Sequence, residues 1–188
     1  ADDNASGTAA LIELAKLLKK TKAPKNNYLF VAFSGEELGL YGSKYFVENP
    51  TISLEKVNYM INMDMVGRLN DSSKTITVGG FGTSPSWSEI LYAVKKPGFN
   101  IKVDSSGTGP SDHSSFYRKD IPVLFFFTGL HTDYHKPSDD ANRINYVGEY
   151  RIVQLVYELV KKTPTDNKLV FTKTREQQTG TSTRFSVS

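Results

Sequence analysis

Acidic and histidine side chains occur in four separate stretches of this 188-residue sequence: Asp2–Asn4, Ser34–Glu37, Asp64 and the stretch from His131 to Asp139. Carboxylates that gather in a fold repel one another, and burial raises the pKa of each, whereas a divalent metal ion removes both penalties. Aspartate, glutamate and histidine suit an oxygen-rich zinc site, or one filled by cobalt or manganese, better than a structural zinc site.

The adjacent glutamates Glu36 and Glu37 allow two tasks to be divided between neighbours. One carboxylate can bind the metal while the other stays free and takes a proton from a metal-bound water. Hydrolysis is the reaction that this inventory of side chains indicates.

The composition limits the alternatives. The chain has no cysteine, so a thiolate zinc site and a disulfide framework are excluded, and any transition metal must be held by carboxylates and the three histidines. With 23 Lys+Arg against 20 Asp+Glu, scattered along the chain, nucleic acid is not an expected partner. No apolar run approaches the roughly 20 residues that span a bilayer.

The elements that must position these side chains alternate between strands and helices. Apolar runs predict strands at 28–33, 57–63, 74–78, 100–103 and 121–127, the last being the strongest and expected in the centre of the sheet. Helical spacing predicts helices at 6–20, 39–47, 85–96 and 147–162. This alternation predicts an α/β fold with many parallel strands and helices on both faces.

The length fits one domain, which we expect to span residues 1–163. Residues 164–188 are rich in Thr, Gln, Ser and Lys and are expected to form a tail or linker, with one possible strand at 169–172. Because Ala1 is neither a methionine nor part of a signal peptide, the sequence is expected to be a fragment.

The four polar stretches are expected to meet at one edge of the sheet. In open α/β sheets, ligands bind beyond the carboxyl ends of the strands. Three of the stretches directly follow predicted strands, and Asp2–Asn4 lies where the first helix begins, which is on the same edge in a βα unit.

Simpler roles remain open for each stretch taken alone. Asp3 or Asn4 is suited to cap the first helix, and Ser34 with Glu37 has the spacing of a capping box. A single histidine such as His135 is commonly an ordinary loop residue. Asp64 is harder to explain in this way, since an aspartate that ends an apolar strand must find a partner for its charge.

Five motifs, in this order between Ala1 and Lys162, together resemble the co-catalytic zinc aminopeptidases of the bacterial leucyl aminopeptidase and aminopeptidase Y type. They are DDNASG at 2–7, FSGEELGLYGS at 33–43, NMDM at 62–65, SDH at 111–113 and DYHKPSD at 133–139. The resemblance implies a three-layer αβα sandwich with a mixed, mostly parallel sheet, peptide substrates and two zinc ions per complete domain. It also implies an extracytoplasmic location.

The resemblance further implies a role for each matched position. Asp3 corresponds to the carboxylate that bridges two zinc ions, Glu37 and His135 to the other protein ligands of one ion, and Asp64 to a ligand of the second. Glu36 corresponds to the general base.

Tyr134 matches a tyrosine that hydrogen-bonds the oxyanion in some members. Asp112 and His113 match a motif near the substrate cleft whose role is less settled; the sequence alone favours a helix start with a hydrogen-bonded histidine.

The resemblance also has a gap. The family takes one ligand of the second zinc from a His-x-Asp motif that precedes the aspartate cluster, and this sequence begins after that point. We therefore expect weak or single-site zinc binding and little activity from this chain. The missing upstream segment would also supply strands of the sheet, so the apolar surface that they would cover is expected to be exposed or to pair with another chain.

Near the end of the sequence, Thr183–Val187 resembles the lead-in to a PDZ domain.

Two other functions stay open. A glutaminyl cyclase shares the implied fold and has a similar site with a single zinc ion, and a binding protein that has lost catalysis keeps the fold alone. A serine hydrolase and a nucleotide enzyme are disfavoured, because the G-x-S-x-G, G-x-x-x-x-G-K-[ST] and G-x-G-x-x-G motifs do not occur.

Overall fold

A four-stranded sheet forms the middle of the fold in the computed structural model, which describes residues 1–21, 26–94, 98–164 and 166–175. The strands are β1 (Met60–Met63), β2 (Thr75–Gly79), β3 (Asn100–Val103) and β4 (Val123–Phe127), in the order β1-β4-β2-β3. β1 pairs with β4 and β2 with β3 in parallel, while β2 and β4 are antiparallel. The predicted mixed, mostly parallel sheet with 121–127 in its interior is confirmed.

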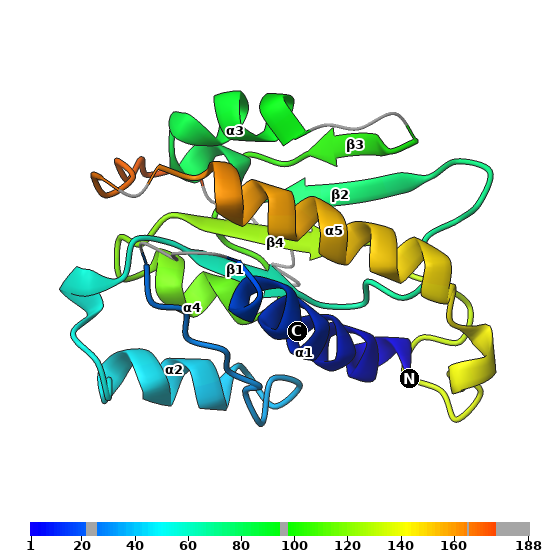
Figure 1. Cartoon of the computed structure of the whole chain (residues 1–188). Helices are drawn as coiled ribbons and strands as arrows, with labels where there is room; N and C mark the ends of the chain where they lie inside the picture. Colours follow the sequence, from blue (N-terminus) through cyan, green and yellow to red (C-terminus); the bar gives the residue numbers. More distant parts are fainter. Residues whose placement is uncertain (22–25, 95–97, 165, 176–188) are drawn as a thin grey trace, which may run out of the picture.

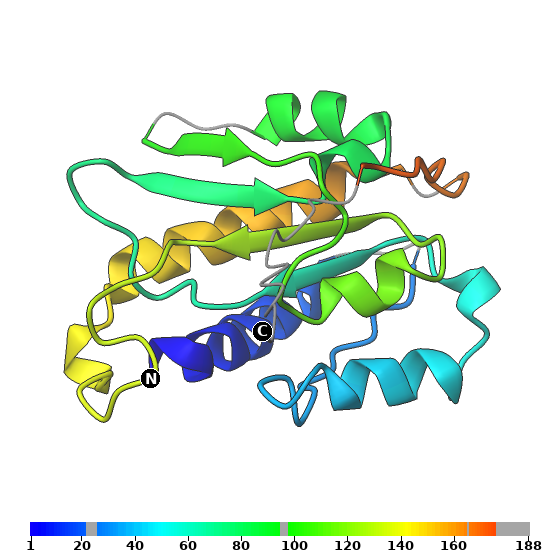
Figure 2. The same cartoon turned by 180° about the vertical axis from the view of Figure 1, so that it is seen from behind.

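Helices cover both faces of the sheet (Figures 1 and 2). On one face lie α1 (Gly7–Lys19), α3 (Ser86–Val94) and α5 (Tyr146–Lys162), and on the other lie α4 (His113–Tyr117) and, against it, α2 (Tyr41–Glu48). This arrangement confirms the predicted α/β sandwich.

Each face of the sheet has its own hydrophobic core. Trp87, Leu124 and Ile152 are fully buried in the larger core, beneath α3 and α5. Phe116 and Val123 are buried in the smaller core, beneath α4. Full burial of one such side chain stabilises the fold by roughly 1.5 to 3 kcal/mol, so the apolar faces visible in the sequence favour this layering.

Helix α1 places its first turn against the carboxyl end of β1. Its buried residues Ala10, Leu14 and Leu18 recur every four positions and face the larger core. A Cβ atom on Gly7 would lie 2.2 Å from the carbonyl oxygen of Met63, so only glycine permits this approach. The close packing brings the residues before α1 next to those after β1.

The predicted strand at 28–33 is wrong, since the structure assigns neither helix nor strand there. Leu29 is 57% exposed, and none of the described backbone hydrogen bonds joins the segment to β1, although Val31 and Ile61 line the same cavity. An apolar run forms a strand only where a neighbour pairs with it, and the described residues supply none here.

The predicted strand at 169–172 is also wrong, because this segment has no strand pairing in the structure. It nevertheless lies against the domain: Leu169 is buried in the larger core and the N–H of Thr172 donates to the carbonyl of Thr83 across 2.8 Å. Thr183–Val187 falls outside the described residues.

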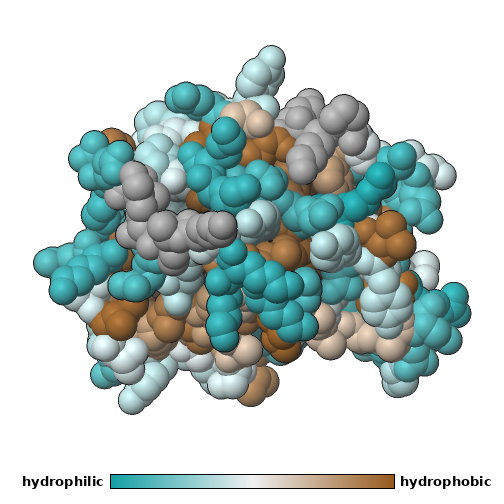
Figure 3. Space-filling view, in the orientation of Figure 1, coloured by the Kyte–Doolittle hydropathy of each residue, from teal (hydrophilic) through white to brown (hydrophobic). Residues whose placement is uncertain are grey.

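The face shown in Figure 3 is mostly covered by hydrophilic side chains, with separate hydrophobic areas between them. None of the described helices is long and apolar enough to cross a membrane.

Candidate metal centre

The side chain of Asn4, and not that of Asp3, caps the start of α1. Oδ1 of Asn4 accepts a hydrogen bond from the N–H of Gly7, the first residue of α1, across 2.9 Å, and its Nδ2 donates to the carbonyl of Met63. These bonds hold the turn before α1 against the end of β1. The Asp3 side chain is left to point into the space beyond the sheet, where it is 15% exposed.

Glu36 and Glu37 lie in a tight turn that leads into α2. Gly35, with φ +64°, takes the left-handed conformation that glycine adopts without strain. The N–H groups of Gly39 and Leu40 both donate to the carbonyl of Glu36. Because α2 begins only at Tyr41, the capping-box interpretation of Ser34 and Glu37 is wrong.

His135 lies in the loop between β4 and α5, in a left-handed conformation with φ 56°. Two features brace the loop: the N–H of Lys136 donates to the carbonyl of Asp133, and Oγ of Ser138 donates to Oδ1 of Asp133 across 2.8 Å. The side chain of His135 is 48% exposed, so its imidazole is accessible from solvent.

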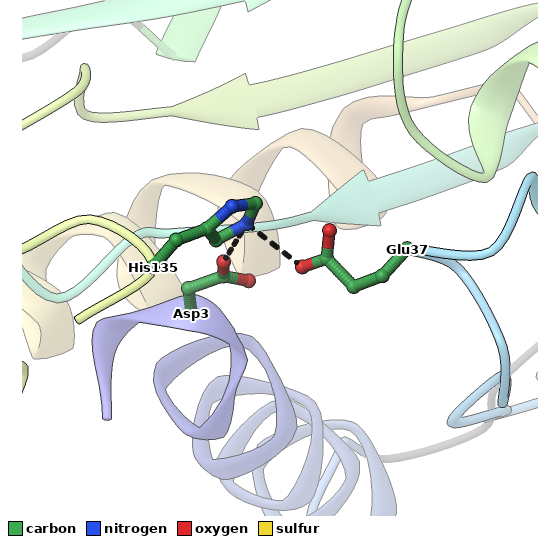
Figure 4. Close-up of side chains that lie close together, drawn as sticks. All are labelled: Asp3, Glu37 and His135. Atoms are coloured by element: carbon green, nitrogen blue, oxygen red, sulfur yellow. Dashed lines mark hydrogen bonds and ion pairs between the residues drawn. The ribbon is translucent and has the colours of Figure 1, made fainter. Parts of the chain in front are cut away.

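Asp3, Glu37 and His135 meet although they come from three distant parts of the chain (Figure 4). Nε2 of His135 lies 3.0 Å from Oδ2 of Asp3 and 3.1 Å from Oε1 of Glu37. One potential ligand atom from each residue lies within 4.8 Å of the other two, and no other such group of three occurs among the described residues.

This arrangement fits a zinc ion. At Zn–N and Zn–O bonds of about 2.0 to 2.2 Å, the ligands of a tetrahedral ion lie roughly 3.3 to 3.6 Å from one another. The two contacts of the His135 nitrogen are slightly shorter than this, so small side-chain movements suffice for coordination. Zinc binds both imidazole nitrogen and carboxylate oxygen, and three protein ligands are the number that its catalytic sites use.

Asp64 directly follows β1 and lies beside this group. Its Oδ2 accepts a hydrogen bond from Oγ of Ser111 across 2.8 Å, and Ser111 in turn accepts one from Nδ2 of Asn62. Oδ1 of Asp64 is buried and has no hydrogen-bond partner among the described residues. Burying a carboxylate oxygen without a hydrogen-bond partner costs free energy. A bound cation would remove this cost, so Oδ1 of Asp64 is a candidate metal ligand.

A cavity of about 360 Å³ joins these acidic side chains. Five carboxylates line it, those of Asp3, Glu36, Glu37, Asp64 and Asp112. Burial, together with the charges of Asp64 and Glu37, raises the pKa of Glu36 to about 7. Burial also raises the pKa of Asp64 to about 6, against the opposing effect of the Ser111 hydrogen bond.

Such shifts are typical of functional sites, and for Glu36 the raised pKa suits a general acid and base near neutral pH. The pKa of Asp3 is raised as well, first by burial and then by the charge of Glu37. The mutual repulsion that the sequence predicted is therefore present.

Tyr134 lies next to the metal group. Its ring stacks on the imidazole of His135 with the ring centroids 3.8 Å apart. Burial and the charges of Glu37 and Asp3 raise the pKa of its phenol, so the hydroxyl stays protonated at neutral pH and can donate a hydrogen bond.

Asp112 and His113 form the start of α4, as the sequence predicted, but the histidine is not fully hydrogen-bonded. Its Nδ1 is buried without a partner among the described residues, and its ring stacks on Phe125 with the centroids 4.5 Å apart. Burial lowers the pKa of His113 to about 4, so the ring is neutral and packs as part of the core.

The sequence did not reveal two supporting residues. Ser111, expected only at a helix start, donates to Asp64, and Arg68 forms ion pairs with Asp133 and Asp139. Ser111 belongs to the SDH motif, but nothing in the sequence indicates its bond to Asp64. Arg68 has no sequence signal, because the contacts of a lone arginine depend on the tertiary fold.

Comparison with known proteins gives a consistent result. The profile of Peptidase family M28 matches residues 1–160. The chain is 32% identical over 178 residues to aminopeptidase YwaD of Bacillus subtilis, covering 86% of this chain and 38% of that protein. It is also 32% identical over 152 residues to leupeptin-inactivating enzyme 1 of Streptomyces exfoliatus, covering 76% of this chain and 32% of that enzyme. The chain thus spans about a third of the length of these relatives.

Solved structures show the same fold. A zinc aminopeptidase from Bacillus subtilis superposes with a TM-score of 0.72 and 28% identity, covering 89% of this chain and 44% of that one. The LapA aminopeptidase of Legionella pneumophila has a TM-score of 0.74 at 24% identity, over 86% of this chain and 46% of that one. A glutaminyl cyclase from Bacteroides thetaiotaomicron has a TM-score of 0.67 at 21% identity, over 87% of this chain and 63% of that one.

Proposed function

Because this chain belongs to peptidase family M28, we propose that it carries metal-binding and catalytic residues of a zinc-dependent aminopeptidase, which removes N-terminal residues from peptides. The observation that carries this proposal is the convergence of Asp3, Glu37 and His135, with ligand atoms within 4.8 Å, from three distant segments.

In the proposed site, Asp3, Glu37 and His135 would hold one zinc ion, and Asp3 and Asp64 would contribute ligands to a second. When bound, zinc lowers the pKa of water and polarises the carbonyl of the substrate. The buried, unpartnered Oδ1 of Asp64 and the raised pKa of Asp3 support this assignment, since both carboxylates gain from a nearby cation.

Glu36 acts as the general base in this proposal. It lines the cavity beside Asp64, and no ligand atom of Glu36 joins the three-residue group, so its carboxylate is free to accept a proton from the attacking water. The same carboxyl group then returns the proton to the leaving amine. Burial raises the pKa of Glu36, which favours a group that can both accept and return a proton near neutral pH.

Tyr134 is proposed to donate a hydrogen bond to the oxyanion of the tetrahedral intermediate. Its place against His135 and its protonated phenol support this role. Hydrogen bonds of this kind contribute roughly 3 to 4 kcal/mol to lowering the barrier in other acyl-transfer enzymes.

The test is hydrolysis of aminoacyl p-nitroanilides by this chain and by the Glu36→Gln variant, with zinc supplied to both. Metal-dependent release of nitroaniline that the variant loses supports the proposal. Turnover by the variant equal to that of the parent chain contradicts the assignment of Glu36.

We propose that this chain binds zinc at one site or weakly, because one ligand group of three is complete among the described residues while none of their histidine ion pairs involves Asp64. Metal analysis and zinc titration count the ions directly. Two tightly bound ions per chain with ordinary peptidase turnover would contradict this part of the proposal.

A single-zinc glutaminyl cyclase is the second candidate, supported by the complete three-ligand group and by the shared fold. Incubation with a peptide that begins with glutamine separates the two functions: the cyclase releases ammonia and leaves the peptide length unchanged, whereas the peptidase releases free glutamine.

The extracytoplasmic location of the protein and the contact between two chains stay predictions.

A further inference from the structure

A second cluster of charged side chains lies beside the proposed metal ligands and is built around Arg68. Nη2 of Arg68 lies 2.7 Å from Oδ1 of Asp139 and 3.3 Å from Oδ2 of Asp133. The side chains of Arg68 and Asp139 are only 15% and 6% exposed. We call Arg68, Asp133 and Asp139 the arginine cluster; none of the three belongs to the proposed ligand set.

Asp139 also holds the backbone that carries the first ligand. Its Oδ2 accepts hydrogen bonds from the N–H groups of Asp2, across 2.7 Å, and Asp3, across 3.1 Å. The same oxygen lies 2.6 Å from the amino group of Ala1. One buried carboxylate therefore binds the guanidinium through one oxygen and the peptide groups around Asp3 through the other.

The arginine cluster joins three of the four segments that carry proposed ligands. Arg68 lies in the segment that follows β1 and Asp64, whereas Asp133 lies in the loop that presents His135. Asp139, from the end of that loop, bonds the backbone of Asp3. The turn that carries Glu37 is the one segment that these described contacts do not reach.

We propose that Arg68 and Asp139 are positioning residues that hold Asp3 and His135 at the spacing that a shared metal ion requires. This inference rests on the proposed metal site. Ligands fixed in advance lose less conformational freedom on binding. The loop of His135 also contacts the turn of Asp3 through His131, whose Nε2 lies 3.2 Å from Oδ2 of Asp2, so the arginine cluster is one of two links between them beside the ligands themselves.

The size of the effect follows from the behaviour of comparable supporting residues, whose loss typically weakens metal affinity by 10- to 100-fold. The variants are Arg68→Met, which keeps the length of the side chain without its charge, and Asp139→Asn, which keeps its shape. Arg68→Lys is the conservative variant. Asp140→Asn is the matched control, because Asp140 is the exposed neighbour of Asp139.

The experiment measures zinc affinity of the 188-residue chain by calorimetry, the visible absorption of the cobalt-substituted protein, and the melting temperature of the metal-free protein. We expect Arg68→Met and Asp139→Asn to bind zinc roughly 10- to 100-fold more weakly, with altered cobalt bands. Arg68→Lys should recover part of the affinity, and Asp140→Asn should match the parent chain.

Unchanged zinc affinity and cobalt spectra in folded Arg68→Met and Asp139→Asn would overturn the proposal, even if their melting temperatures fall, because the cluster would then be structural only. If Arg68→Met does not fold, Asp139→Asn and Arg68→Lys decide the question in the same way. Failure of the parent chain to bind zinc would instead overturn the proposed metal site.

Discussion

Nε2 of His135 lies 3.0 Å from Oδ2 of Asp3, which places a residue from the loop before α5 against a residue that precedes α1. The same nitrogen is 3.1 Å from Glu37, so three ionisable side chains share one point in space. In the absence of a cation this contact concentrates negative charge, and in its presence the same contact becomes a coordination site. The following predictions test that interpretation.

Replacing His135 with alanine should weaken zinc binding by more than about 100-fold, since removal of a direct ligand exceeds the effect of removing a supporting residue. Calorimetric titration measures the change. The control is Glu13→Gln, which alters an exposed ion pair with Lys16 far from the site. Equal zinc affinity of His135→Ala and the control would show that the imidazole is not a ligand.

Glu36→Gln and Glu37→Gln form a matched pair that separates catalysis from metal binding. Glu36→Gln should keep zinc affinity and lower turnover of an aminoacyl anilide by about 100- to 10,000-fold, the usual contribution of a general base. Glu37→Gln should lower zinc affinity, because Glu37 belongs to the ligand group. If Glu36→Gln loses the metal and Glu37→Gln retains it, the two roles are reversed.

Asp64→Asn should stabilise the metal-free protein at pH 7. Burial raises the pKa of Asp64 from 3.8 to about 6, so the unfolded state releases its proton more readily and stability falls as the pH rises from about 4 to 6. A neutral side chain avoids this loss, which is worth about 1 to 3 kcal/mol. Urea unfolding in the presence of a chelator measures the gain.

The same variant should gain less stability from zinc than the parent chain does. A ligand that binds only the folded state at 100 times its Kd stabilises it by about 2.7 kcal/mol, and a weakened site gives less at the same zinc concentration. A variant less stable than the parent chain at pH 7 without metal, yet equally stabilised by zinc, would contradict a metal-binding role of Asp64.

His113 should make the protein less stable in acid. Burial lowers its pKa from 6.5 to about 4, so between these values the unfolded state binds a proton that the folded state does not. Stability is therefore lost as the pH falls from 6.5 to 4, by up to about 3 kcal/mol.

His113→Leu should remove this dependence, because Nδ1 has no described partner to lose and the leucine can pack against Phe125. Urea unfolding between pH 4 and 7 measures both proteins. Parallel stability curves for the two would exclude His113 as the titrating group.

The chain order of the helices and strands could be predicted from the sequence. The four helices at 6–20, 39–47, 85–96 and 147–162 and the strands at 57–63, 74–78, 100–103 and 121–127 all have counterparts in the structure. The strand at 100–103 has the predicted bounds, and the ends of the other elements are shifted. These elements bury apolar faces whose period is visible in the sequence.

The prediction of a strand at 28–33 is wrong for a physical reason that the hydrophobic periodicity of the sequence cannot reveal. Its apolar run favours a strand, but a strand also needs a paired neighbour, and pairing is decided by the rest of the sheet. Leu29 and Phe30 are exposed accordingly.

By itself, the sequence determined the alternation of elements, and with it the edge of the sheet at which Asp64 and His135 lie, because the parallel strands that precede them end on one side. Glu36 and Glu37 line the same cavity without a strand before them, so the tertiary structure placed them there. Only the tertiary structure decided which of these side chains touch and what supports them. Asn4 caps α1, Ser111 holds Asp64, and Arg68 with Asp139 ties the backbone of Asp3 to the loop of His135. Such contacts depend on directions and distances across the packed fold, which residue types and their spacing do not specify.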